Sequence, residues 1–232
     1  MAPRLRRRST ALLVLWTLAG APLLAEPVGV AVRVLPRVDA YLVGKEVHPL
    51  RRNDPIELGL TVLLRDPHSF LQVGFNLGGC LSVLPEGGRS HQFTGTATLD
   101  GQSEMDFGDA TDPSASRLRL ALGRLVLKLR SVPDCPKRPE VHTPHAVIYP
   151  KGTSFRVLVD PVAGTFVGVD EGSIMVQAEA GGDPVEVKAG QWTVVPPGGK
   201  PNRPASLNSV DILDDPPLPL RDFTTEPPGP PQ

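Results

Sequence analysis

The sequence predicts an all-β protein, and three observations carry this prediction. Apolar residues alternate with polar ones at a period of two in many short runs, as at Phe155, Val157 and Val159. Such alternation is typical of strands with one buried face. Turn signals containing glycine or proline separate the runs every 8–12 residues or so. The chain holds 23 glycines and 27 prolines, a composition that disfavours helices and suits short strands.

The first 25 residues have the pattern of a secretory signal peptide. A basic start with Arg4 and Arg6–Arg8 precedes the apolar run Ala11–Leu24, and the small residue Ala25 stands before Glu26. The apolar core of about 10–14 residues is shorter than the roughly 20 of a membrane-spanning helix. We therefore expect a signal helix, cleavage after Ala25 and a periplasmic or secreted mature chain. An uncleaved anchor is the alternative.

The mature chain is predicted to be acidic. Removal of residues 1–25 leaves 20 basic and 25 acidic side chains. Nucleic-acid binding is disfavoured because it requires a basic face. The mature part has no apolar run of the roughly 18 residues that a membrane span requires, so we expect no second span.

Residues 28–84 are expected to form strands, and the acidic segment after them an irregular insertion. The expected strands are Val28–Val34, Val38–Val43, Ile56–Leu64, Ser69–Phe75 and Leu81–Leu84. Residues 85–117 are rich in glycine, serine and threonine and carry a cluster of acids: Asp100, Glu104, Asp106, Asp109 and Asp112. Several oxygens could hold calcium, but the spacing is not that of an EF-hand loop, and a solvated insertion is favoured. Residues 117–130 then predict a strand, a bend at Gly123 and a second strand.

The region from Val141 to Val195 has the clearest β pattern. Alternation predicts about five strands, separated by turns at Gly164, Glu171–Gly172, Gly181–Pro184 and Ala189–Gln191. Gly152 permits a bend ahead of the first of these strands, which Thr153 begins.

This region resembles the FecR domain. The motif pieces, in the family's order, are Thr143-Pro144-His145-Ala146, Lys151-Gly152-Thr153-Ser154-Phe155, Glu171-Gly172 within Val169–Val176, and Ala189-Gly190-Gln191. The sequence departs from the family at Ile148-Tyr149-Pro150, where small residues and glycine are usual. The match is firm from Gly123 and extends to a domain over residues 26–195.

The resemblance implies a fold and a role. The fold would be a twisted β-solenoid-like stack of short strands. The role would be that of a non-enzymatic, protein-binding or regulatory module at the bacterial cell envelope. Its partner would be an unidentified envelope protein, which would bind by strand addition at an open sheet edge. About ten residues precede the apolar segment, too few for the sigma-factor-binding arm of the best-known members.

Two other functions stay open. A carbohydrate- or cell-wall-binding module would need a surface row of aromatic residues, for which Trp192, Tyr41 and Tyr149 are available. A hydrolase could assemble its site from distant residues, although no recognised catalytic motif is present.

No catalytic residue, metal ligand or cofactor is predicted. His142 and His145 could chelate zinc if the chain turned there, but Pro144 favours an extended backbone that separates them. Lys151-Gly152-Thr153 does not match a phosphate loop, because its glycine follows the lysine.

The remaining features are two cysteines and a proline-rich tail. Cys80 and Cys135 could form one disulfide, which would close a loop of about 55 residues and stabilise the fold by roughly 4 kcal/mol. Two separate thiols are the alternative. Residues 196–232 hold 11 of the 27 prolines and are expected to be an extended or disordered linker, with Val210–Leu213 and Leu218–Leu220 as docking alternatives.

Overall fold

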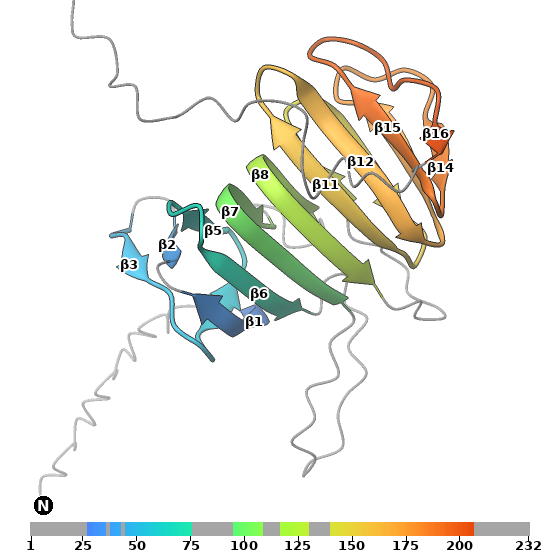
Figure 1. Cartoon of the computed structure of the whole chain (residues 1–232). Helices are drawn as coiled ribbons and strands as arrows, with labels where there is room; N and C mark the ends of the chain where they lie inside the picture. Colours follow the sequence, from blue (N-terminus) through green and yellow to red (C-terminus); the bar gives the residue numbers. More distant parts are fainter. Residues whose placement is uncertain are drawn as a thin grey trace, which may run out of the picture.

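A computed structural model describes residues 27–35, 38–42, 45–75, 95–108, 117–129 and 140–206 (Figure 1). Every regular element in these ranges is a strand, which confirms the all-β prediction. Within them, no helix has the length and apolar character needed to cross a membrane. The expected signal helix, Cys80, Cys135 and the tail beyond residue 206 lie outside the described residues.

Sixteen strands are defined in the described ranges. They are β1 (Pro27–Leu35), β2 (Val38–Leu42), β3 (His48–Pro49), β4 (Pro55–Glu57), β5 (Leu60–Leu64), β6 (Phe70–Phe75), β7 (Gly95–Phe107), β8 (Arg117–Leu129), β9 (Glu140–His142), β10 (Ala146–Pro150), β11 (Ser154–Asp160), β12 (Gly164–Glu171), β13 (Ser173–Ala178), β14 (Val185–Lys188), β15 (Gln191–Val195) and β16 (Ala205–Ser206).

All sixteen strands are hydrogen-bonded into one continuous sheet, which the long β7–β8 hairpin folds into two layers (Figure 1). Residues 95–100 of β7 pair with β6, whereas residues 103–107 pair with β5. Strand β8 divides in the same way, because residues 123–128 pair with β11 and residues 117–119 pair with β9. The first layer therefore has the order β4-β1-β6-β7-β8-β11-β12-β15-β16, and the second β3-β2-β5-β7-β8-β9-β10-β13-β14.

Glycines produce the bends at which the hairpin passes between layers. Gly101 in β7 and Gly123 in β8 have φ angles of 61° and 95°, in the region that favours glycine. The β7–β8 register shifts between Asp100 and Glu104. The Ser103 hydroxyl holds this bend, donating to Asp100 O over 2.8 Å and accepting from Arg124 N over 3.0 Å. The predicted bend at Gly123 is confirmed, but the residues on its two sides belong to one strand, β8, and not to two.

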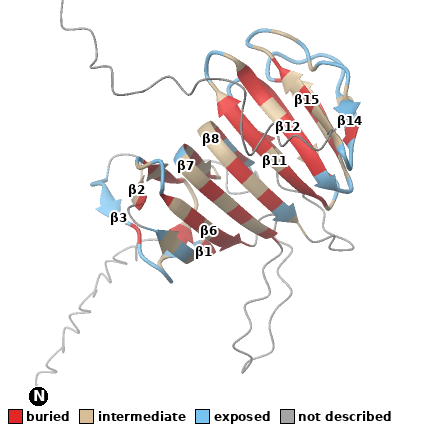
Figure 2. Ribbon diagram, viewed as in Figure 1, coloured by how far each residue is buried: buried red, intermediate tan, exposed pale blue. Residues whose placement is uncertain are grey.

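The buried apolar residues of the described strands form one hydrophobic core between the two layers. Alternate residues of nearly every strand point into it, which gives the banded pattern of buried and half-buried positions in Figure 2. The largest fully buried side chains include Phe75, Phe107 and Phe155. Burying a side chain of this size contributes about 1.5–3 kcal/mol, so the alternation read from the sequence is also the main source of stability.

The acidic insertion is the first place where the structure differs from the sequence prediction. Residues 95–107 form strand β7, with Ala97, Leu99 and Met105 buried in the core. The alternation was obscured because small residues and threonines occupy many of its positions. The prediction of an irregular segment is therefore wrong for residues 95–107, while Asp109 and Asp112 lie outside the described residues.

The second difference concerns the start of the tail. Residues 196–206 return along the edge of the first layer, where β16 pairs with β15. The amide of Asn202 donates to Val194 O over 2.9 Å, and the Thr193 hydroxyl donates to Asn202 O over 2.7 Å. The linker interpretation and the domain boundary at Val195 are thus wrong for residues 196–206, which complete the sheet.

Two further points qualify the strand predictions. The expected strand Ile56–Leu64 is divided into β4 and β5 by a turn at Leu58–Gly59, and Gly59 has a φ of 81°. Paired strands run antiparallel throughout the described sheet except β8 and β9, which are parallel. The solenoid-like stack is therefore not confirmed, and the supported description is an all-β fold of two layers.

Candidate functional site

Three of the four motif pieces meet at one end of the sandwich, where they form turns. They are Lys151–Thr153 before β11, Gly172 between β12 and β13, and Ala189–Gly190 before β15. The amide of Ala189 donates to Gly172 O over 2.9 Å, and the amide of Gly190 donates to Val169 O over 2.8 Å. Gly152, Gly172 and Gly190 have φ angles of 80°, 77° and 74°, so the motif glycines are required by the backbone.

The side chains of these three pieces have structural contacts. Phe155 is fully buried in the core, and a Cβ at Gly172 would lie 2.8 Å from Thr153 Cγ2. Lys151 Nζ lies 4.0 Å from Glu186 Oε1. Gln191 Oε1 accepts a 3.1 Å hydrogen bond from the amide of Lys188. The predicted role of Gly152 as a bend is confirmed by its positive φ.

The fourth piece lies at the opposite end and joins the two layers. Thr143 Oγ1 accepts from the amide of Ala146 over 2.9 Å and lies 2.8 Å from Thr165 Oγ1 in β12. His145 Nδ1 lies 3.1 Å from the same Thr165 hydroxyl. Pro144 is the exposed corner of this turn. Because all three polar side chains are buried, their mutual hydrogen bonds are needed for stability.

The two candidate zinc histidines are directed to different surroundings. His142 lies on the outer side of the second layer, with Nε2 3.0 Å from Glu140 Oε2 and Nδ1 3.7 Å from Glu179 Oε2. His145 instead belongs to the buried hydroxyl network. In the described ranges, no group of three or more histidines, cysteines, aspartates or glutamates could hold a metal ion. Of the candidate calcium ligands, Asp106 accepts a 2.6 Å hydrogen bond from the Thr61 hydroxyl.

Tyr149 shares the outer side of the second layer with these carboxylates. Burial raises the pKa of the Tyr149 phenol, as do the charges of Glu140 and Glu179, while Arg117 acts in the opposite direction. Its hydroxyl donates to Gln177 Oε1 over 3.3 Å. This phenol remains protonated at neutral pH and acts as a hydrogen-bond donor.

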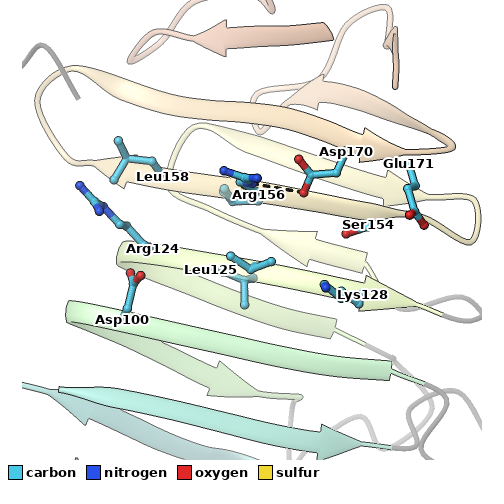
Figure 3. A pocket seen from close by; sticks show the side chains of 11 residues that line it. Asp100, Arg124, Leu125, Lys128, Ser154, Arg156, Leu158, Asp170 and Glu171 are labelled. Atoms are coloured by element: carbon cyan, nitrogen blue, oxygen red, sulfur yellow. Dashed lines mark hydrogen bonds and ion pairs between the residues drawn. The ribbon is translucent and has the colours of Figure 1, made fainter. Parts of the chain in front are cut away.

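An open depression of about 520 Å³ lies on the outer side of the first layer, across β7, β8, β11 and β12 (Figure 3). We call it the β8–β11 depression. It is lined by Asp100, Arg124, Leu125, Val126, Lys128, Ser154, Arg156, Val157, Leu158, Asp170 and Glu171. The charged members come from four strands, so the depression exists only because the sheet register aligns them.

The charges of the depression are arranged in two ways. Arg156 Nε and Asp170 Oδ2 lie 3.2 Å apart and form an ion pair across β11 and β12. Arg124 and Lys128 project from β8, and neither forms an ion pair with another side chain of the described residues. The depression thus offers one oriented guanidinium and two further cations beside it.

Two aromatic side chains flank the depression on the same side of the sheet. Gly168 of β12 pairs with Trp192 of β15, and Phe166 pairs with Val194. Phe166 and Trp192 are therefore diagonal neighbours on the outer surface, and both are half-buried. Diagonal cross-strand neighbours are within reach of aromatic side chains, so the two rings extend the depression with an apolar surface.

Sequence reasoning identified Trp192 only as an available aromatic residue, and it missed Arg124, Lys128, Arg156 and Asp170 as members of a site. A charged residue at every second position of a strand indicates only a solvated face. One signal in the sequence could have found them. Arg124, Val126 and Lys128 stand at alternate positions and so share one side of β8, and Arg156 stands at an outward position of the neighbouring strand β11.

No family model matches this chain, and a search of curated proteins finds no match either. The FecR resemblance therefore stays a prediction.

Proposed function

We propose that this chain is an exported, non-enzymatic protein-binding module of FecR-like type, and that its partner binds over the β8–β11 depression. The observation that carries the proposal is the gathering of Trp192, Phe166, Arg124 and Arg156 on one outer surface of the first layer. Tryptophan and arginine are the residues most enriched among the dominant contacts of protein interfaces.

The shape and chemistry of the depression favour a protein partner over a small molecule. Small-molecule sites are usually concave, enclosed and mainly apolar, whereas this depression is open and lined by charges of both signs (Figure 3). The Arg156–Asp170 ion pair holds the guanidinium in one direction before a partner arrives. Such pre-organisation reduces the entropy lost on binding.

Binding through this face is favoured over strand addition at the edge of the second layer. Strand β14 has only four residues, follows Pro184 and carries the exposed Glu186 and Lys188. The amide of Lys188 already donates to Gln191 Oε1. Short, charged edges that follow a proline resist pairing with another chain.

The FecR-like and regulatory parts of the proposal rest on the sequence resemblance and the signal-peptide pattern. One topological feature supports the solenoid-like description. Strands β9 and β10 lie in the second layer, β11 and β12 in the first, β13 and β14 in the second, and β15 and β16 in the first. The chain thus winds around its core two strands at a time.

Site-specific photo-crosslinking in the native envelope tests the proposal. A photoreactive amino acid at Phe166, beside the depression, should capture a protein partner. The same amino acid at Tyr149, on the outer side of the second layer, is the matched control and should capture much less. Equal capture from the two positions, or none from Phe166, would contradict the assignment of the binding face.

A glycan- or cell-wall-binding function is the second candidate, because Trp192 and Phe166 form an aromatic platform beside polar groups. Retention of the purified chain on peptidoglycan, abolished by Trp192→Ala, would favour this function over protein binding. A hydrolase would be indicated by saturable turnover that a single substitution abolishes.

A further inference from the structure

We infer, on the basis of the proposed protein-binding function, that the partner presents an extended acidic segment to the β8–β11 depression. Two of its carboxylates, four residues apart, would contact Arg124 and Lys128. An apolar side chain midway between them would cover Val126. The partner class is therefore a peptide segment with an acidic–apolar–acidic pattern at alternate positions.

The spacing of the two cations carries the inference. Arg124 and Lys128 are four residues apart on the same side of β8, so their backbones are separated by about 13 Å at roughly 3.3 Å per residue. An extended ligand has the same rise, so its residues i and i+4 repeat at the same distance. Lys128 is exposed and Arg124 half-buried, and within the described part of the chain neither is neutralised by an ion pair.

On β8 the residue between the two cations is apolar, whereas Arg156 of β11, which is ion-paired with Asp170, pairs with it from the neighbouring strand. Val126 lies between Arg124 and Lys128 on β8 and is half-buried. Leu158 of β11 pairs with Arg124 and is only 5% exposed. A surface with charges alone would bind polyanions regardless of their sequence. An apolar contact at the middle position instead favours a ligand with an apolar residue there, because burial of apolar surface adds binding free energy.

The acids around the depression limit the kind of anion that fits. Asp100 pairs with Arg124 along the β7–β8 register, Asp170 engages Arg156, and Glu171 lies at the rim. The lining therefore holds three acids and three cations. A long polyanion needs a run of uncompensated cations, so two separated contacts to a short acidic segment suit this surface better.

Fluorescence anisotropy with the full mature chain tests the inference. The probe is a labelled synthetic peptide of about nine residues with two aspartates four residues apart and leucine midway. A second peptide of equal composition has its aspartates three apart, which places them on opposite sides of an extended backbone. We expect the first peptide to bind more tightly, and its binding to weaken with salt.

Variants connect the binding to the two cations. Arg124→Ala and Lys128→Ala should each weaken binding about fivefold, the upper range for an exposed ion pair. Arg119→Ala is the matched control, since Arg119 is an exposed cation of the same strand in the second layer, and should have no effect. The Arg124 backbone amide, not its side chain, donates to Ser103 Oγ, so the alanine variant should keep the bend. Circular dichroism melts check this.

The outcomes separate the inference from the proposed function. Equal affinity for the two peptides, unchanged affinity in both variants, or tighter binding of a heparin probe than of the first peptide would overturn the acidic-segment inference. If any of these results accompanies a partner captured at Phe166, the binding function stands and only the ligand class is wrong. If no partner is captured, the binding function fails.

Discussion

Replacement of Gly123 by alanine should destabilise the protein strongly, because this glycine lies where β8 passes between layers. Its φ is 95°, and a Cβ there would lie 2.1 Å from Ser103 Oγ and 2.4 Å from Gln102 O. The conformational strain costs about 1–3 kcal/mol. Crowding against a packed neighbour costs about 1–3 kcal/mol more. The expected total of about 2–6 kcal/mol is a large part of a typical stability of about 5–15 kcal/mol.

Gly181→Ala is the matched control for this prediction. Gly181 has a similar φ of 91°, but a Cβ there would have nothing within 4 Å, so only the conformational strain applies. Urea unfolding followed by far-ultraviolet circular dichroism compares the two variants. The crowding difference of about 1–3 kcal/mol, at a slope of about 1–3 kcal/mol per molar urea, should lower the midpoint of Gly123→Ala by roughly 0.3–3 M relative to Gly181→Ala. Equal midpoints would refute the crowding argument at the bend.

Three further predictions follow from the other contacts. Thr165→Val should lower the free energy of unfolding by about 1–3 kcal/mol, because it leaves buried polar groups of Thr143 and His145 without their partner. Thr165→Ser keeps the hydroxyl and should lower the free energy of unfolding less. Equal losses in the two variants would contradict this reasoning. The amide of Asn202, bonded to Val194 O, should exchange with deuterium more slowly than the amide of Lys200, and equal rates would contradict an ordered return of residues 196–206. Because the Tyr149 pKa is raised in the folded state, the folded protein binds more protons than the unfolded chain above about pH 10. The free energy of unfolding should therefore fall as pH rises from about 10 through the folded pKa of Tyr149. The fall should be smaller in Tyr149→Phe. Identical pH profiles of the two proteins would contradict a raised pKa at Tyr149.

The strands that could be predicted from the sequence are those with one buried and one open face. In β13, Ile174, Val176 and Ala178 are buried at every second position with half-buried residues between them, and the alternation indicated the strand directly. Strand β10 was missed because Ala146, Val147 and Ile148 are all buried. A strand covered on both sides has no alternation to read.

The turns were predictable for a different reason. Gly152, Gly172 and Gly190 have positive φ angles, so glycine itself marks the position of each turn. The tail was misjudged because proline content indicates only that a segment lacks a helix. Backbone hydrogen bonds such as that from Asn202 to Val194 O depend on an edge that composition does not reveal.

The binding face could not be predicted, because it depends on strand register. Val126 and Arg156 are 30 positions apart in sequence, and only the β8–β11 pairing places them side by side. A shift of that register by one residue would turn Arg124 and Lys128 toward the core. The register is fixed instead by Leu125 and Leu127, which are buried opposite Val157 and Phe155. The core residues that the alternation identified thus also determine which charges meet outside.

The bend and the binding face are physically connected through one residue. Arg124 follows Gly123 directly, and its amide donates to the Ser103 hydroxyl that spans the bend. The same hairpin holds the second layer through residues 117–119 of β8. The direction of the Arg124 side chain is therefore set by the passage of β8 from one layer to the other. A change that relaxes the bend should therefore move the Arg124 side chain relative to Lys128, which lies farther along the strand. The distance between the two cations would then no longer match carboxylates four residues apart on an extended ligand.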